Sequence, residues 1–110
     1  MTTHVSSLAS EHCVANAKAL RESDIATLSK AAPGWTRKGG AIERRFKFKD
    51  FHQTMEFVNA VAWIAHREDH HPDLVVGYDH CGVTWSTHSA GGLTRNDYIC
   101  AARTGALVDA

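Results

Sequence analysis

The most regular pattern of apolar positions runs from residue 51 to residue 65 and predicts a long amphipathic helix packed on a sheet. Asp50 stands at its N-cap position with Gln53 three residues later, as in a capping box. The helix should end at or just before Asp69, because Pro72 disfavours helical geometry in the residue that precedes it. The apolar positions are Phe51, Met55, Val58, Ala62 and Ala65, widened by Phe57, Val61 and Ile64.

A hairpin is predicted before this helix. A short strand over residues 35–38 leads through the turn pair Gly39-Gly40 to a longer strand over residues 41–49. The longer strand alternates between apolar and charged positions, as expected when one face of a sheet is covered and the other is solvated. Its inward members are Ile42, Phe46 and Phe48, interrupted by Arg44.

A second hairpin is predicted after the long helix. Residues 74–78 and 83–87 are rich in strand-forming side chains. His80-Cys81-Gly82 lies between them and predicts a three-residue loop, with Gly82 in a left-handed conformation. If the two strands pair in this way, the start of the first lies beside the end of the second.

Shorter helical patterns precede the first hairpin and follow the second. Ser23 can cap a helix over residues 24–31, which Pro33-Gly34 ends. Thr94 can cap the last helix, with Asp97 three residues on. The order of helix, hairpin, helix, hairpin and helix predicts an α+β fold in two layers. A four-stranded antiparallel sheet would be covered on one face by helices.

Composition narrows the class of protein. The 110 residues fit one domain, which we place at residues 23–110 after a loosely held lead-in over residues 1–22. The formal net charge is zero, so no global field favours direct binding of nucleic acid or of an anionic membrane. Three cysteines without a CxxC spacing argue against a disulfide framework and favour a reducing cytoplasm. We identify no signal peptide and no transmembrane segment.

Eight histidines are the compositional feature that points to chemistry. Asp69-His70-His71-Pro72 lies where the long helix passes into a strand, and His88 follows the last strand. The hairpin should therefore bring His88 beside His70 and His71 at one end of the sheet. Histidine titrates near neutral pH, so three histidines around one cavity can act as acid and base on one substrate.

Two other interpretations of the histidines stay open. A lone histidine is more often a surface or hydrogen-bonded residue, which we expect for His4, His12, His52 and His80. Alternatively, His66 and His70 are four residues apart and would share a helix face that chelates zinc, with His71 or His88 as a third ligand. Arg67 stands where the zincin motif has glutamate, which argues against that motif.

Several motifs of the chain occur together in one known family. They are Pro33-Gly34-Trp35, residues 46–51, residues 69–73, Tyr78, Ser86-Thr87-His88, Gly92-Leu93-Thr94 and Asp97. In this combination the chain, from about residue 23 to residue 107, resembles the pterin-4a-carbinolamine dehydratases. The resemblance implies dehydration of 4a-hydroxytetrahydropterin to quinonoid dihydropterin, which recycles the cofactor of aromatic amino-acid hydroxylases. It also implies the two-layer fold and a homodimer or homotetramer.

The resemblance places His70, His71 and His88 as the active-site histidines. We expect His70 and His88 to transfer protons, and His71 to bind and orient the pterin. The reaction changes no oxidation state, so neither a cofactor nor a metal is expected. The substrate-binding residues expected beside the histidines are Asp69, Pro72, Ser86, Thr87 and Asp97.

Three positions depart from the family's pattern. His66 stands where many members have an acidic residue, Leu74 where an aromatic residue is common, and Ala90 where the animal enzymes have cysteine. These changes bear on the preference for pterin side chains, and His66 is a candidate for the proton relay. The alternative function is a dimeric binding module or transcriptional coactivator on the same fold. The complete set of three histidines favours the enzyme, since a scaffold has no physical need for them.

Overall fold

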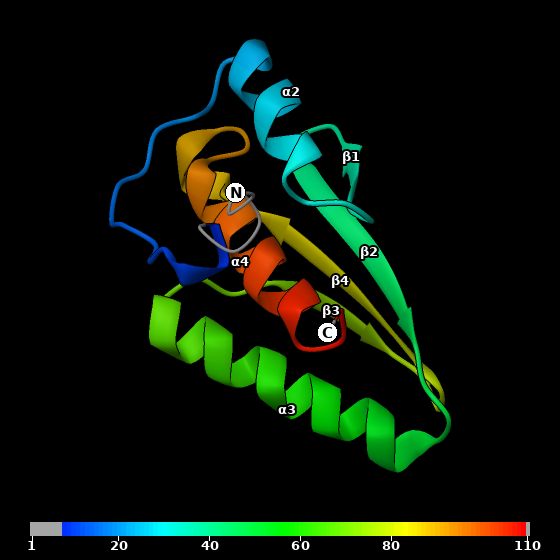
Figure 1. Ribbon diagram of the computed structural model, residues 1–110. Coiled ribbons are helices and arrows are strands. Elements are labelled where there is room, and N and C mark those ends of the chain that lie inside the picture. The colour runs from blue at the N-terminus through cyan, green and yellow to red at the C-terminus, as the bar shows by residue number, and fades with distance from the viewer. Residues whose placement is uncertain (1–7, 110) are drawn as a thin grey trace.

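The computed structural model describes residues 8–109 and shows one sheet with helices packed on one of its faces (Figure 1). Its elements are α2 Glu22–Lys30, β1 Thr36–Lys38, β2 Ala41–Lys47, α3 Phe51–Glu68, β3 Asp73–Val76, β4 His80–Ser86, the short 3₁₀ helix η1 His88–Ala90 and α4 Arg95–Ala106. The strands lie in the order β1-β2-β4-β3, and every neighbouring pair is antiparallel. The predicted α+β class and the order of helices and hairpins are confirmed.

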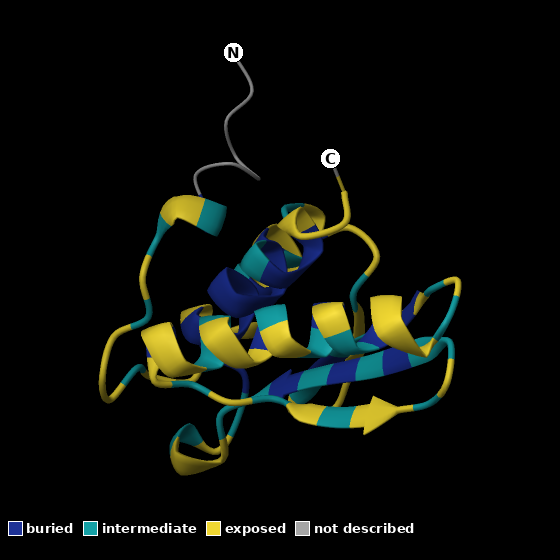
Figure 2. Ribbon diagram, turned by 90° about the horizontal axis from the view of Figure 1, so that it is seen from below, coloured by how far each residue is buried: buried dark blue, intermediate teal, exposed yellow. Residues whose placement is uncertain are grey.

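The core lies between the sheet and the helices. Buried and less buried side chains alternate along both β2 and β4, and the register of the two strands places their buried residues side by side. Cys81, Val83 and Trp85 point inward from β4 and have no exposed surface. In the register of the two strands Trp85 lies opposite Ile42, and Cys81 opposite Phe46. Figure 2 shows the resulting buried face toward α4 and the exposed outer surfaces of α3 and β3. Each large apolar side chain buried here contributes on the order of 1.5–3 kcal/mol to folding.

The helix caps agree with the sequence at two of three positions. Asp50 accepts a hydrogen bond from the backbone N–H three residues on, at 2.9 Å, and so caps α3. Thr94 and Asp97 form the expected capping box of α4. The prediction for α2 was wrong by two residues, because Arg21 is its N-cap and Ser23 lies inside its first turn. The residue just before this cap, Leu20, is held by a backbone hydrogen bond to Leu93 at 2.8 Å. The helix therefore begins directly after that anchored residue, two residues earlier than predicted.

The turn of the second hairpin differs from the prediction. The loop comprises residues 77–79, whereas His80, Cys81 and Gly82 are the first residues of β4. The pairing of β4 with β2 sets the position of the loop, because β2 extends alongside these three residues and places Lys47 opposite His80. Gly77 N–H also donates to His80 C=O at 2.9 Å, which closes the loop three residues earlier in the chain than predicted.

The buried stripe of α3 overlaps the predicted one only in part. Phe57 and Val61, which the pattern included, are buried, and so is Thr54, which it did not include. Phe51 and Ala62, two of its expected members, are exposed. The Thr54 hydroxyl lies 2.9 Å from two carbonyl oxygens, those of Asp50 and Tyr78, which satisfies this polar side chain where it is buried.

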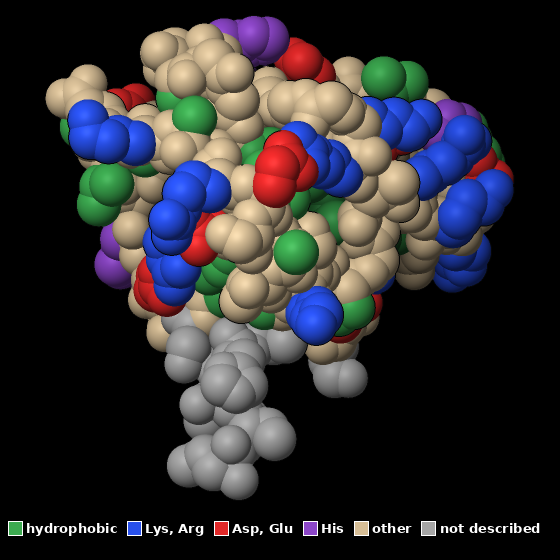
Figure 3. Space-filling model, turned by 90° about the horizontal axis from the view of Figure 1, so that it is seen from above, with side chains coloured by type: hydrophobic (Ala, Val, Ile, Leu, Met, Phe, Trp, Pro, Cys, Tyr) green, Lys and Arg blue, Asp and Glu red, His purple; other side chains and the backbone are tan. Residues whose placement is uncertain are grey.

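Ion pairs neutralise several charged side chains at the surface. Figure 3, which views the molecule from above, shows basic side chains interspersed with acidic ones on that face, with further Lys and Arg gathered toward one side. Arg44, the interruption in the apolar face of β2, lies over the ring of Phe46 at 4.5 Å and pairs through two hydrogen bonds with Asp109. Asp109 has a lowered pKa because of the hydrogen bonds from Arg44. Part of the basic run of β2 is therefore neutralised within the chain.

A segment before α2, which we call the N-terminal strap (residues 8–20), crosses the ends of α3 and α4. Val14 and Asn96 exchange two hydrogen bonds, at 3.0 and 2.8 Å. The N–H of Leu20 donates to the carbonyl of Leu93 at 2.8 Å. The predicted lead-in over residues 1–22 begins outside the described residues; of its described part, residues 8–20 form the strap, and Arg21 and Glu22 already belong to the start of α2.

Glu68, the last residue of α3, anchors the strap. Its side chain is 3% exposed, and it accepts hydrogen bonds from the Cys13 N–H at 2.7 Å and from His12 Nδ1 at 2.9 Å. Arg103 of α4 lies 3.7 Å away. Burial raises the pKa of the Glu68 carboxyl, but these hydrogen bonds and the charge of Arg103 outweigh burial and lower the pKa below its ordinary value of 4.5.

Replacing Glu68 with alanine should therefore destabilise the fold in a pH-dependent way. We expect the free energy of unfolding to fall by about 1–3 kcal/mol at neutral pH, because the Cys13 N–H loses its acceptor and Arg103 loses a nearby negative charge. A carboxyl with a lowered pKa contributes stability that is complete above its unfolded pKa and is lost as the pH falls through its folded pKa. The difference from wild type should thus shrink below pH 4.5. Urea unfolding at several pH values measures it, with exposed Glu56→Ala of the same helix as control. An equal effect of the two substitutions would contradict the anchoring role.

Candidate active site

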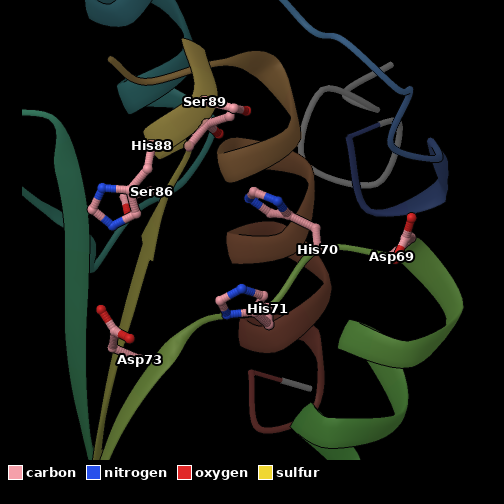
Figure 4. Close-up of a pocket in the computed structure, with 8 residues that line it drawn as sticks. Asp69, His70, His71, Asp73, Ser86, His88 and Ser89 are labelled. Atoms are coloured by element: carbon pink, nitrogen blue, oxygen red, sulfur yellow. The ribbon is translucent and has the colours of Figure 1, made fainter. Parts of the chain in front are cut away.

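The candidate site lies at the end of the sheet where β3 begins and β4 ends. A pocket of about 310 Å³ is lined by Asp69, His70, His71, Asp73, Ser86, Thr87, His88 and Ser89. Figure 4 shows His70 and His71 on one side of it, from the segment that joins α3 to β3, and His88 on the other. The structure therefore brings the three histidines together, as the hairpin geometry predicts.

The turn after α3 directs the first two histidines into the pocket. Asp69 adopts a left-handed conformation with φ of 53°, one of the few such residues apart from glycines among those described. Aspartate tolerates this conformation better than most residues. The His70 N–H donates to the Ala65 carbonyl at 3.2 Å, which closes the end of the helix. The chain then runs straight into β3 through Pro72, with His71 exposed at the pocket.

His70 is held by a buried carboxylate. Its Nε2 lies 2.7 Å from Asp97 Oδ1, and Asp97 has no exposed surface. The other oxygen of Asp97 accepts from the Thr87 hydroxyl at 2.8 Å and from the Thr94 N–H at 2.9 Å. A carboxylate in the first turn of α4 is also favoured by the helix dipole. With Nε2 engaged, Nδ1 is the nitrogen through which His70 can exchange a proton with a ligand.

The ring of His70 is supported from beneath by Trp85. The two rings are stacked, with centroids 5.5 Å apart and planes inclined by 14°. Trp85 is completely buried, and among the described residues its Nε1 has no hydrogen-bond partner. An indole with a buried unpaired N–H costs free energy that a purely apolar side chain would not. What tryptophan provides at this position is a broad flat face for His70.

His88 is set differently from His70. It begins η1, and its Nε2 is 3.5 Å from the hydroxyl of Ser86. His88 is exposed, as is His71, so both rings are accessible to solvent. Gly91 ends η1 with φ of 76°, a conformation that suits glycine. The site thus combines one clamped histidine with two accessible ones.

A second hollow adjoins the first. It has a volume of about 440 Å³ and shares Asp73, Ser86, Thr87 and His88 with the pocket above. Its far wall is made by backbone around Gly40 and Gly91. A flat ligand lying across the end of β4 would be within reach of both hollows.

The remaining predicted residues are placed in two ways. Asp69, Ser86 and Thr87 line the pocket, whereas Asp97 lies behind His70. Pro72 is not among the lining residues, and its contribution is to the backbone of the connecting segment. Sequence reasoning missed Asp73, Ser89 and Trp85. The alternation of β4 contained a signal for Trp85, since it faces inward beside the strand's last residue.

The premise of the zinc interpretation was wrong. α3 ends at Glu68, so His66 and His70 do not share a helix face. His66 instead lies on the outer surface of α3 and packs on the Trp63 ring, with centroids 5.5 Å apart. Within residues 8–109 no cluster of three or more His, Cys, Asp or Glu side chains is arranged to hold a metal ion.

Fold and pocket together define a small α+β protein with a histidine-lined site at one end of its sheet. The chain belongs to the pterin-4a-carbinolamine dehydratase family, whose model matches residues 18–107. It is accordingly a hydro-lyase. None of the helices over residues 8–109 has the length and apolar character needed to cross a membrane.

Similar proteins support this assignment. A protein of Nitrosospira multiformis, provisionally named pterin-4-alpha-carbinolamine dehydratase, is 47% identical over 97% of both chains. One of Stenotrophomonas maltophilia with the same provisional name is 56% identical over 82% of this chain and 79% of its own.

Two solved structures are also similar. A transcriptional coactivator/pterin dehydratase from Brucella melitensis has a TM-score of 0.78 and 36% identity, over 82% of this chain and 98% of its own. A pterin dehydratase-like protein identified as a RuBisCO assembly factor in the alpha-carboxysome has a TM-score of 0.55 and 26% identity, over 66% and 84%.

Proposed function

We propose that this chain removes water from 4a-hydroxytetrahydropterin by histidine acid/base catalysis, and so takes part in recycling the pterin cofactor of aromatic amino-acid hydroxylases. The observation that carries the proposal is His70, clamped between buried Asp97 and Trp85 in a pocket shared with His71 and His88. The capping box of α4 accounts for one oxygen of Asp97, whereas the other oxygen is bound to His70 at 2.7 Å, as expected for a histidine that is oriented for catalysis.

The proposed chemistry transfers two protons and breaks the bond between C4a and its hydroxyl oxygen. The substrate loses the hydroxyl on C4a and the proton on N5, and a double bond forms between these atoms. His70 accepts the N5 proton through Nδ1, because Asp97 stabilises the positive charge that the ring acquires. His88 donates a proton to the departing hydroxyl, which leaves as water. Exchange with solvent resets both rings, and His88 is open to solvent.

His71 is proposed to bind the pterin rather than to transfer its protons. We expect His71→Ala to raise KM for the carbinolamine several-fold, with a smaller change in kcat. Initial rates over a range of substrate concentrations measure both constants. His52→Ala, an exposed histidine at the other end of α3, is the control. A fall in kcat as large as that for His70→Ala would instead place His71 among the proton-transferring groups.

Acceleration of carbinolamine loss tests the proposed reaction. The substrate is generated by an aromatic amino-acid hydroxylase, and its decay is followed by ultraviolet absorbance with and without the purified chain. We expect a rate well above the spontaneous one, unchanged after treatment with a chelator. No acceleration would contradict the proposal and favour the alternative, a binding module or coactivator. The homodimer or homotetramer and the cytoplasmic location stay predictions.

A further inference from the structure

Two cysteines that are far apart in the sequence touch in the fold. Cys13 Sγ of the N-terminal strap lies 3.5 Å from Cys100 Sγ of α4. Cys100 has no exposed surface, whereas Cys13 is partly exposed. The strap passes α4 on its way to α2, as Figure 1 shows. The third cysteine, Cys81, is buried in β4 and makes no such contact with a thiol among the described residues.

The backbone around Cys13 holds its thiol against α4. The Cys13 N–H is bound by Glu68 at 2.7 Å, and Val14 exchanges two hydrogen bonds with Asn96. The Cys13 thiol also donates toward the Asn96 carbonyl at 3.6 Å. Anchors on both sides of the thiol keep the pair in register while the residue itself lies outside any helix or strand. A disulfide needs the sulfurs to approach to about 2 Å, and an irregular segment adjusts more readily than α4.

We propose that Cys13 and Cys100 are an oxidisable pair that forms an intramolecular disulfide when the protein meets a peroxide. Peroxide first converts the Cys13 thiol to a sulfenic acid and is itself reduced to water. The Cys100 sulfur then attacks the Cys13 sulfur, the S–S bond forms, and the hydroxyl leaves as a second water. Cys13 reacts first because it is the more exposed of the two residues. The hydrogen bond with Cys13, together with burial, raises the pKa of the Cys100 thiol, so its resolving role rests on the 3.5 Å contact with Cys13 and not on an activated thiolate.

The link would fasten the strap to the helix that carries Asp97. Cys100 lies one turn after Asp97 on α4, and Asn96 is already bound to the strap. The disulfide would close a loop comprising most of the chain, and long loops give the largest stabilisation in the chain-entropy model. Oxidation would thereby fix the support of His70 without altering any group that lines the pocket. This inference rests on the strap and α4 alone and is independent of the proposed reaction.

Thiol counting and peptide mapping after peroxide treatment test the pair. Wild type and Cys81→Ser are treated with hydrogen peroxide, and the thiols are counted in denaturant. We expect wild type to fall from three free thiols to one, and Cys81→Ser from two to none. A proteolytic peptide pair joined through Cys13 and Cys100 should appear, the melting temperature should rise by at least about 5 °C, and dithiothreitol should reverse both changes.

Variants of each member make the test specific. Cys13→Ser and Cys100→Ser should each keep the Cys81 thiol and form no intramolecular link. If Cys81→Ser keeps both thiols, stops at a sulfenic or sulfinic acid, or links only between molecules, the proposal is overturned. Cys81→Ser keeps both members of the pair, so its thiol count tests the proposal even if Cys100→Ser fails to fold.

Discussion

His70→Ala is expected to lower kcat for dehydration by about 10²–10⁴-fold, the usual contribution of one positioned acid or base. The expectation follows from the geometry of its ring, which is fixed at Nε2 by Asp97 and on one face by Trp85. KM should change less, because His71 is assigned to binding. Steady-state rates of carbinolamine loss give both constants.

His66→Ala is the matched control for this substitution. His66 is exposed on the outer surface of α3 and is not among the residues that line the pocket. We expect its dehydration rate to equal that of wild type, which would also remove His66 from the proton relay. If His66→Ala lost as much activity as His70→Ala, the pocket would be wrongly assigned.

Asp97→Ala should have the largest effect on stability as well as a large effect on rate. The substitution removes the carboxylate from three hydrogen-bond partners: His70 Nε2, the Thr87 hydroxyl and the Thr94 N–H. Removing one member of such a buried pair costs about 3–5 kcal/mol of unfolding free energy. Urea or thermal unfolding measures this loss.

Asp97→Asn separates orientation from folding. The amide keeps the volume of the side chain but has one acceptor oxygen for three donors, and it carries no charge to stabilise a protonated His70. We expect a smaller loss of stability than for alanine and a fall in kcat of about 10²-fold or more. Asp79→Asn is the control, because Asp79 also pairs with a histidine, His80 at 3.1 Å, but outside the pocket. Full activity of Asp97→Asn in a folded protein would contradict the positioning role.

The order of elements could be predicted because it depends on local patterns. The alternation of β2 and the spacing in α3 identify a strand and a helix whatever surrounds them. Asp50 and Thr94 mark helix starts because caps act within one turn. The loop of the second hairpin could not be placed in this way. Pairing with β2, a contact between distant segments, draws His80 and its neighbours into the strand.

The site was predictable to the extent that the hairpin determines it. Antiparallel pairing alone brings His88 to the end of the sheet where His70 and His71 lie. What supports His70 depends on how α4 packs against that end, so the sequence places Asp97 near the site without identifying it as the partner of His70. The strap could not be foreseen either. Its contacts are scattered hydrogen bonds and one buried side chain, Leu8, and they leave no periodic pattern in the sequence.

The most direct test compares wild type with His70→Ala/His88→Ala in the decay of enzymatically generated 4a-hydroxytetrahydropterin, after chelator treatment of both. Unfolding curves and circular dichroism first establish that the double variant is folded. Acid/base catalysis by these two histidines predicts that wild type strongly accelerates the decay and that the double variant falls to the spontaneous rate. A folded double variant that retains the wild-type rate would contradict catalysis by the histidines of this pocket.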